Sequence, residues 1–404
     1  MSGSVFSAAE ILLPRTEHPE TWSVIACDQF SSEPEYWRRA AETVGDRPST
    51  LHMIVPEAFL EGTDLAAAAA ARGEVMASYL AQDVFCAYPG AFVYVERTTS
   101  TGKLRRGLVG KLDLEAYDYR PGTTAPVRAS EKTVVERLPA RITVRERACL
   151  ELPHVMMLAD DPDGTIVEPL TAKRERLPLL YDFGLMEGGG HLAGRVVAGK
   201  DAEAVQAAVD AFADWEVQMV IGDGNHSLAA AKACWDALKK TLSPAERETH
   251  PARWALVELN NVYDAGIGFE AIHRVLFGVE PEHLVQALRD GLGDGPGSDV
   301  RVVWAGGSAQ VRVPAASFGG TVAALQDVLD RYLAETGCGI DYIHDDAAAS
   351  AMAEKPGAAA IFLPAMDKAD LFRTVERDGV FPRKSFSIGH ARDKRYYMEC
   401  RRIR

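Results

Sequence analysis

Apolar and polar positions in the first third of the chain predict strands as well as helices. The apolar runs 91–97 and 104–112 have the length of strands, and the segment Thr99–Gly102 between them has the small polar residues of a tight turn. Two strands joined in this way form an antiparallel hairpin, which argues against an all-parallel doubly wound sheet. The alanine-rich segment 66–82 predicts a helix.

The segment before this helix predicts one further strand and one further helix. The strand is expected at 23–27, where the residues are mainly apolar. The helix is expected to begin near Glu33, with Ser31-Ser32 as its cap and Pro34 in its first turn.

Strands and helices alternate in the centre of the chain. The expected order is a strand at 155–158, a polar turn at 159–164, a helix at 201–213, a strand at 217–221, a helix ending near 238 and a strand at 255–259. Residues 215–260 are therefore expected to form the centre of the functional domain. The glycine-rich segment 184–190 lacks the preceding strand of a dinucleotide fingerprint and is interpreted as a mobile loop or lid.

The last third predicts a smaller region and a returning tail. Helices are expected at 282–290, 322–335 and 368–378, and strands at 300–304 and 359–363. We therefore divide the chain into an N-terminal α+β region (1–145), a central region (146–275), a smaller α+β insertion (276–340) and a C-terminal segment that returns to the core (341–404). The predicted fold class is α+β, with mixed sheets, the antiparallel hairpin and a strand-turn-helix unit.

The junction after the strand at 217–221 carries the most distinctive chemistry of the chain. An apolar run ends in Gly222, Asp223 and Gly224, and Asn225, His226 and Ser227 then open an alanine-rich helix. The first N–H groups of a helix lack partners within it and carry the positive end of its dipole, so this turn is predicted to bind phosphate. His226 would donate to the phosphate, and Asp223 would accept a hydroxyl proton or hold Mg²⁺. The structural alternatives are a self-bonded turn aspartate and a packed histidine.

Other polar residues are candidates for the same site. Glu131 and Asp28 could each be a general base or a metal ligand, or simply a cap. Arg383 and Lys384 could supply cations for phosphate, or belong to a solvated basic surface, because Lys394 and the arginines after it make the whole tail basic. Isolated histidines such as His154 and His273 are interpreted as structural.

Composition narrows the class of protein. The 404 residues are 47% hydrophobic, which permits a substantial core, and the net charge of -14 argues against a general nucleic-acid binder. No segment approaches the roughly 20 apolar residues of a membrane helix, so a cytoplasmic protein is expected. The six cysteines are scattered singly, which fits reduced thiols in the core better than disulfides or a zinc cluster.

Metal and nucleotide motifs of the usual kinds are not found in the sequence. There is no H-E-x-x-H, paired-cysteine or G-x-x-x-x-G-K-[ST] motif. A divalent metal would need the fold to gather ligands such as His344, Asp345, Asp346, Asp182 and Asp223 with His226. Metal-dependent hydrolysis therefore remains an alternative function, and the identity of any metal stays open.

Several segments together resemble one prokaryotic family. The D-G-N-H-S sequence at 223–227 is similar to the D-G-H-H-R signature of the domain-of-unknown-function family ten-fifteen. Further segments that fit the same family are Trp22–Phe30, Arg128–Thr133, Glu151–His154, Ile272–Phe277 and Phe381–Ser387. The turn also resembles the phosphate-binding turn in the fold shared by sulfiredoxin, the ParB nucleotide switch and an ADP-dependent free serine kinase, with Asn225 in place of the first histidine and Ser227 in place of the arginine.

This second resemblance implies a ParB/sulfiredoxin-like core and a nucleotide ligand. The predicted function is phosphoryl transfer from a nucleotide, ATP or ADP, to a small hydroxyl-bearing metabolite, with Mg²⁺ as a possible cofactor. The predicted catalytic residues are Asp223, His226, Glu131 and Asp28, and the predicted phosphate ligands are Gly222, Gly224, Asn225, His226, Ser227, Arg383 and Lys384. A nucleotide-responsive switch without turnover is the alternative from another class. The oligomeric state and the convergence of Asp28, Glu131, His154, His273 and His344 on the turn stay open.

Overall fold

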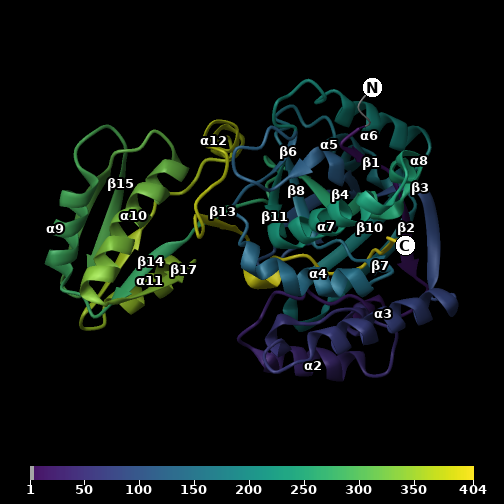
Figure 1. The fold of residues 1–404 in the computed structure, drawn as a ribbon, viewed down its shortest axis with the longest axis horizontal. Helices are drawn as coiled ribbons and strands as arrows, with labels where there is room; N and C mark the ends of the chain where they lie inside the picture. The colour runs from purple at the N-terminus through teal and green to yellow at the C-terminus, as the bar shows by residue number, and fades with distance from the viewer. Residues whose placement is uncertain (1–3) are drawn as a thin grey trace. The chain divides into compact units, whose positions relative to one another are not determined.

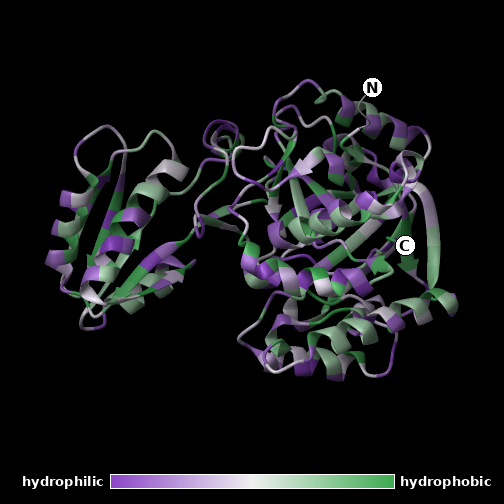
Figure 2. Ribbon diagram, viewed as in Figure 1, coloured by the Kyte–Doolittle hydropathy of each residue, from purple (hydrophilic) through white to green (hydrophobic). Residues whose placement is uncertain are grey.

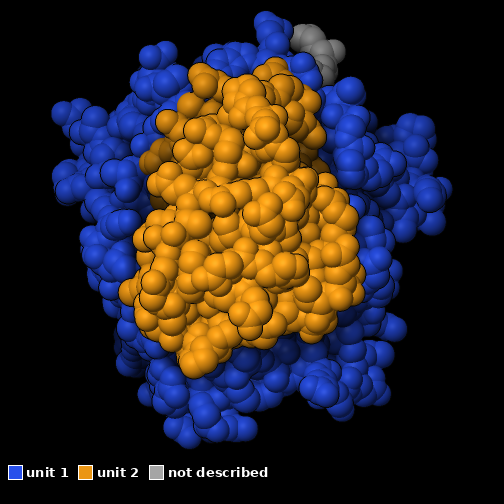
Figure 3. All heavy atoms as spheres, turned by 90° about the vertical axis from the view of Figure 1, so that its left-hand side faces the viewer, with its two compact units in different colours: residues 1–267, 390–404 blue, residues 268–389 orange. Residues whose placement is uncertain are grey.

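The computed structural model describes residues 4–404, which divide into two units (Figure 3). Unit 1 comprises the described residues up to Ile267 together with His390–Arg404, and unit 2 comprises Gly268–Gly389. The division of the chain into four regions stays a prediction. Among the described residues, no helix combines the length and the hydropathy that crossing a membrane requires.

Unit 1 contains the predicted hairpin and the predicted strand-turn-helix unit (Figure 1). Its strands are β1 (Phe6–Ser7), β2 (Ala9–Pro14), β3 (Phe85–Thr98), β4 (Leu104–Asp113), β5 (Tyr117–Asp118), β6 (Val127–Ala129), β7 (Leu150–Glu151), β8 (Val155–Ala159), β9 (Leu179–Leu185), β10 (Gly190–Val197), β11 (Met219–Asp223), β12 (Trp254–Asn261) and β20 (Arg401–Arg402). Its α-helices are α1 (Pro19–Trp22), α2 (Pro34–Val44), α3 (Leu65–Ala81), α4 (Leu138–Arg147), α5 (Glu168–Ala172), α6 (Lys200–Asp210), α7 (Asn225–Leu238) and α8 (Pro244–Thr249).

The main sheet of unit 1 is mixed. Within the described residues its longest path runs β5-β6-β11-β8-β12-β4-β3-β10-β9, with β1 paired to β4 and β2 paired to β3. Strand β11 runs parallel to β6 and antiparallel to β8, while β3 and β4 form the predicted antiparallel hairpin. These pairings confirm the α+β class with mixed sheets.

Both faces of this sheet are buried. Along β3, Phe92 and Tyr94 belong to one hydrophobic core, which also contains residues of α5, α6 and α7. Val93 and Val95 point to the opposite face and belong to a second core, with residues of α2 and α3. The period of two along a strand thus distributes consecutive apolar residues between two cores, and the central strands are mainly green in Figure 2.

A charged network lies within unit 1. Arg395 pairs through Nη1 with Glu258 Oε2 at 2.7 Å and through Nη2 with Glu399, and all three side chains are at most 4% exposed. Arg105 Nε lies 3.7 Å from Glu258 Oε1, which also accepts a hydrogen bond from Asn260 Nδ2 at 3.0 Å. Burial opposes ionisation of Glu258, but the neighbouring arginines hold its pKa below the ordinary value. The basic tail of the sequence is therefore partly a core element.

Unit 2 is built on its own antiparallel sheet. Its strands are β13 (Phe269–Ala271), β14 (His273–Phe277), β15 (Ser298–Trp304), β16 (Gly307–Val313), β17 (Gly339–Ile343), β18 (Ala358–Phe362) and β19 (Phe386–Ile388), and its helices are α9 (Pro281–Leu292), α10 (Phe318–Thr336), α11 (Asp346–Ala353) and α12 (Asp370–Asp378). The larger sheet has the order β16-β15-β18-β14-β17, and β13 pairs with β19.

Local predictions were wrong at three places in unit 1. The strand expected at 23–27 is reduced to an isolated bridge between Ile25 and Tyr396. Helix α2 has Glu33 as its N-cap without a side-chain cap hydrogen bond, instead of a serine cap. The segment 184–190 does follow a strand, because it contains the turn of the antiparallel β9–β10 hairpin, and its role as a mobile loop or lid stays a prediction. In β9, Asp182 and Gly184 alternate with the buried residues Tyr181, Phe183 and Leu185, so the strand has one apolar face and no long apolar run.

Candidate functional site

The junction of β11 and α7 depends on glycine at position 224. Gly224 is the N-cap of α7 and has a left-handed conformation, with φ 80° and ψ 21°. A Cβ at this position would lie 3.0 Å from Val155 Cα and 3.1 Å from His154 Cδ2. As a glycine, this N-cap supplies no side-chain cap hydrogen bond. The first N–H groups of a helix have no partner within the helix, so its N-terminus is a candidate anion site.

A lysine and an aspartate lie beside this N-terminus. Asp223 Oδ1 accepts a hydrogen bond from the Gly224 N–H at 3.0 Å, and Asp223 Oδ2 lies 3.3 Å from Lys394 Nζ. The Lys394 side chain is only 12% exposed. Lys394 thus brings a cation to the turn from the C-terminal segment of unit 1.

The segment 130–134 runs alongside the start of α7. Ser130 Oγ accepts a hydrogen bond from Asn225 Nδ2 at 3.3 Å, and His226 Nε2 accepts one from the Val134 N–H at 3.1 Å. His226 Nε2 is therefore an acceptor here, and the role of His226 as a phosphate donor stays a prediction. Among the described residues, Asn225 Oδ1 is buried without a hydrogen-bond partner.

An ion pair contacts the same turn. His154 Nε2 lies 3.3 Å from Asp28 Oδ2, and Gln29 Nε2 donates to Asp28 Oδ1 at 2.9 Å. His154 Cδ2, the ring carbon next to this nitrogen, lies close to Gly224. The pair is thus in direct contact with the N-cap of α7.

Burial and pairing act against each other on both charges of this pair. Burial disfavours the Asp28 carboxylate, but His154 and two hydrogen bonds hold the pKa of Asp28 well below its usual value. Burial also disfavours the imidazolium, yet its anionic and hydrogen-bonding neighbours raise the pKa of His154 well above the ordinary value. At neutral pH the pair therefore consists of a carboxylate and an imidazolium.

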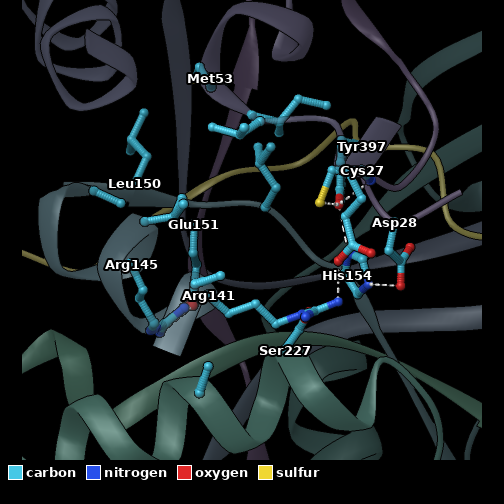
Figure 4. A pocket seen from close by; sticks show the side chains of 18 of the residues that line it. Cys27, Asp28, Met53, Arg141, Arg145, Leu150, Glu151, His154, Ser227 and Tyr397 are labelled. Carbon is cyan, nitrogen blue, oxygen red and sulfur yellow. Dashed lines mark hydrogen bonds and ion pairs between the residues drawn. The ribbon is translucent and has the colours of Figure 1, made fainter. Parts of the chain in front are cut away.

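A cavity of about 180 Å³ adjoins the ion pair (Figure 4). Its wall contains Asp28 and His154, Ser227 from the first turn of α7, and Arg141 from α4. Most of the remaining wall is apolar, and the apolar lining residues are Met53, Ile54, Val55, Leu60, Leu65, Met76, Ala140, Val144, Ala148, Leu150, Leu152 and Ala230. Since a cavity of about 150 Å³ accommodates benzene, this one has room for a short apolar group.

Glu151 and Arg141 of the cavity wall already have charged partners within the protein. Glu151 pairs with Arg145 at 2.7 Å and with Arg401 at 2.6 Å, and accepts a hydrogen bond from the Leu256 N–H at 2.8 Å. Arg141 donates to Glu57. The carboxylate and imidazole of the Asp28–His154 pair are therefore the better candidates for contact with a ligand.

The structure brings together part of the predicted site. Asp28 and His154 adjoin the turn, and Glu131 is half-buried in the segment 130–134 that lies alongside the start of α7, next to Ser130. The interpretation of His154 as merely structural missed this position. Arg383, Lys384, His273 and His344 lie in unit 2, and their approach to the turn stays a prediction.

A metal cluster is not found among residues 4–404. No group of three or more His, Cys, Asp or Glu side chains there has an arrangement that could hold a metal ion. Asp182 instead pairs with His191 at 2.9 Å on the β9–β10 hairpin, and Asp346 pairs with His273 at 2.6 Å in unit 2.

The Asp28–His154 pair should make stability depend on pH. The raised pKa of His154 stabilises the fold fully below about pH 6.5, and this contribution is lost as pH rises through the folded value. The lowered pKa of Asp28 stabilises the fold above about pH 4, and this contribution is lost as pH falls through its folded value. The pair therefore contributes most between about pH 4 and pH 6.5.

His154→Gln should accordingly lower the free energy of unfolding by about 1–3 kcal/mol at pH 5.5 and by less at pH 9. Urea unfolding followed by tryptophan fluorescence measures this loss. Five of the six tryptophans lie in unit 1, and Trp304 lies in unit 2. The control is His191→Gln, which removes a histidine from a pair whose side chains are 45% and 49% exposed. A loss that is the same at both pH values, or equal to that of the control, would contradict the charged pair.

Comparison with known proteins places the chain in a family. Residues 9–368 match the family described as "Protein of unknown function (DUF1015)". The chain belongs to the DUF1015 family. The match confirms the resemblance drawn from the D-G-N-H-S sequence and the further segments. The DUF1015 description names no activity, and no curated protein matches the chain.

Solved structures similar to this DUF1015 chain are distant. A conserved hypothetical protein from Pyrococcus furiosus is 12% identical with a TM-score of 0.34, over 69% of this chain and 89% of its own. A free serine kinase in complex with AMP is 11% identical with a TM-score of 0.37, over 72% and 91%. SbnI from Staphylococcus aureus, truncated at its C-terminus, is 8% identical with a TM-score of 0.35, over 70% and 82%. These values are too low to transfer a ligand or a core fold to the DUF1015 chain, so the ParB/sulfiredoxin-like core stays a prediction.

Proposed function

We propose that this chain is an enzyme that binds the phosphate of a nucleotide at the N-terminus of α7 and transfers a phosphoryl group to a small hydroxyl-bearing metabolite. The observation that carries the proposal is the glycine N-cap of α7, beside which Lys394 pairs with Asp223 and the Asp28–His154 pair contacts Gly224. Helix N–H groups and cations are the usual partners of phosphate. The choice of a nucleotide rests on the sequence resemblance of the turn.

The charges around the turn suit phosphoryl transfer. A loose transition state spreads charge over the phosphoryl oxygens, so catalysis is mainly positioning and neutralisation. Lys394 and the imidazolium of His154 provide positive charge near the helix N-terminus. Asp28 is held ionised and lines the cavity, so it can accept a hydrogen bond from the acceptor hydroxyl and orient it.

Mg²⁺ fits this site only as a partner of the nucleotide. Mg²⁺ bound to phosphates commonly needs one or two protein carboxylates, and Asp223 is the carboxylate beside the turn. When bound, the ion would neutralise phosphate charge.

Nucleotide-dependent thermal unfolding tests the phosphate site. At about 100 times its dissociation constant, a ligand should add about 2.7 kcal/mol to the stability of the natural protein. Lys394→Met should weaken binding about tenfold by removing one charge-assisted contact worth roughly 1.4 kcal/mol. The ligands are ATP, ADP, AMP and inorganic phosphate, each with and without Mg²⁺.

The matched control is Lys239→Met. Lys239 pairs with Glu115 at 2.9 Å and with Asp236 at 2.7 Å just beyond the opposite end of α7, so its loss should leave binding unchanged. No stabilisation by any of the four ligands would overturn the phosphate site. Binding without transfer to any of a panel of hydroxyl compounds, serine included, would remove the kinase activity and favour a nucleotide-responsive switch.

A further inference from the structure

A cysteine lies in the cavity wall beside the ion pair. Cys27 and Tyr397 both line the cavity, and the Tyr397 hydroxyl lies 3.6 Å from Cys27 Sγ (Figure 4). The same hydroxyl accepts a hydrogen bond from the Cys27 N–H at 3.1 Å and lies 2.6 Å from His154 Nδ1. The thiol therefore belongs to a cluster of four interacting side chains, Cys27, Tyr397, His154 and Asp28.

The hydrogen bonds of this cluster have a defined direction. His154 Nε2 faces the Asp28 carboxylate, so an imidazolium donates there and donates from Nδ1 to the Tyr397 oxygen. With the Cys27 N–H also donating to this oxygen, its two acceptor positions are filled. The Tyr397 hydroxyl therefore donates its hydrogen to Cys27 Sγ.

These hydrogen bonds aim a donor at the sulfur of Cys27. Burial raises the pKa of the Tyr397 hydroxyl, which keeps its hydrogen in place as a donor. A cysteine reacts as a nucleophile through its sulfur, and a hydrogen-bond donor aimed at sulfur can stabilise the charge that develops there during the reaction. Asp28 fixes the imidazolium on the side away from the tyrosine and the thiol, and His154 in turn orients the Tyr397 hydroxyl rather than taking the thiol proton as the histidine of a catalytic triad does.

We propose that Cys27 is a nucleophile that accepts an acyl group from an activated acyl compound whose apolar chain occupies the cavity. The residues of the cavity wall indicate the chemical class of the acyl group. Met53, Leu65 and Met76 are among the apolar residues around a space of about 180 Å³, which suits a short hydrocarbon chain. The proposal does not rest on phosphate binding at α7.

The step balances with p-nitrophenyl butyrate as the acyl donor. The sulfur of Cys27 attacks the carbonyl carbon, a C–S bond forms and the C–O bond to p-nitrophenolate breaks. The thiol proton passes to the departing phenolate or to solvent, so the products are butyryl-Cys27 and p-nitrophenol. Hydrolysis of the thioester by water would return the thiol and release butyrate. In this scheme Tyr397 and His154 are positioning residues.

The other cysteines of the chain are internal references. Burial raises the pKa of Cys149, Cys234 and Cys400, which makes them slower nucleophiles. Mass spectrometry of the full chain after brief exposure to p-nitrophenyl butyrate can therefore compare six thiols in one sample. Cys27 should carry the butyryl group at least about tenfold faster than any other cysteine, in line with the contribution of a positioned acid–base group.

Two tyrosine variants separate the hydrogen bond to sulfur from packing. Tyr397→Phe should slow acylation of Cys27 about tenfold or more, because the hydroxyl that donates to sulfur is lost. Tyr396→Phe removes the neighbouring hydroxyl, which contacts Met186 and Tyr36 instead, and should leave the rate unchanged. His154→Gln should slow the reaction as well, and Cys27→Ser should abolish the thioester.

Each outcome decides the proposal. Preferential labelling of Cys27 that falls in Tyr397→Phe but not in Tyr396→Phe supports it. Labelling of Cys27 no faster than of the other cysteines, or equal rates in the two tyrosine variants, would overturn it. The labelling experiment contains no nucleotide, so a lack of Cys27 labelling would not argue against the phosphate site. A lack of nucleotide binding would likewise not argue against Cys27 as a nucleophile.

Discussion

Replacing Arg395 with methionine is expected to lower the free energy of unfolding by about 3–5 kcal/mol, because two buried carboxylates lose their shared partner. Glu258 is 1% exposed and Glu399 is fully buried, so water cannot take the place of the guanidinium. Tyr181 also donates to Glu399, but a neutral hydroxyl cannot balance its charge. Urea unfolding monitored by tryptophan fluorescence measures the loss.

The neighbouring arginine offers a control for this variant. Arg392 is exposed and donates to the Glu187 carbonyl, so Arg392→Met should cost less than about 1 kcal/mol. Combining Arg395→Met with Glu399→Gln should recover part of the loss, since one unpaired charge is removed with its partner. If Arg395→Met lowered the free energy of unfolding no more than Arg392→Met does, the buried ion pairs of Arg395 would not stabilise the fold.

The elements that the sequence predicts well are those with a strong local pattern. The helix expected at 66–82 is α3 (Leu65–Ala81), and the runs at 91–97 and 104–112 are parts of β3 and β4. The strand, the glycine turn and the helix at the candidate site were predicted because an apolar run, two glycines and an alanine-rich segment follow one another. Each of these signals lies within about a dozen residues, which is the range over which periodicity and turn chemistry act.

The rest of the site depends on contacts between segments far apart in the sequence. Strand β8 runs antiparallel to β11, and this places His154, just before β8, beside the turn that follows β11. The bridge of Ile25 with Tyr396 places Asp28 and Tyr397 in the same region. Neither pairing has a local signal, so His154 was interpreted as structural, and Asp28 was named without its partner.

The same limit applies to the cation at the turn. The sequence shows a basic tail, and from it Arg383 and Lys384 are expected to supply cations for phosphate. The tail residues that follow have different roles: Lys394 pairs with Asp223, whereas Arg395 is buried against Glu258 and Glu399. Charge alone does not separate a site lysine from a core arginine one residue later, because the separation depends on which face of the chain is buried.

Gly224→Ala is expected to cost about 2–5 kcal/mol, because a left-handed alanine adds about 1–2 kcal/mol of backbone strain and crowding adds about 1–3 kcal/mol. The crowding comes from Val155 Cα at 3.0 Å and His154 Cδ2 at 3.1 Å from the new Cβ. Gly102→Ala is the matched control in the same unit, since Gly102 has φ 79° with nothing within 4 Å of a Cβ.

The difference between the two alanine variants measures how tightly the turn packs against His154. Urea unfolding should show a loss at Gly102 limited to the backbone strain, about 1–2 kcal/mol, and a larger loss at Gly224. Equal losses would mean that the segment at His154 yields easily and does not hold the start of α7. Gly224→Ala should then also weaken the stabilisation by nucleotide. Such a result would mean that the contact between His154 and Gly224 both stabilises the fold and orients the N–H groups of α7, because His154 is also the partner of Asp28.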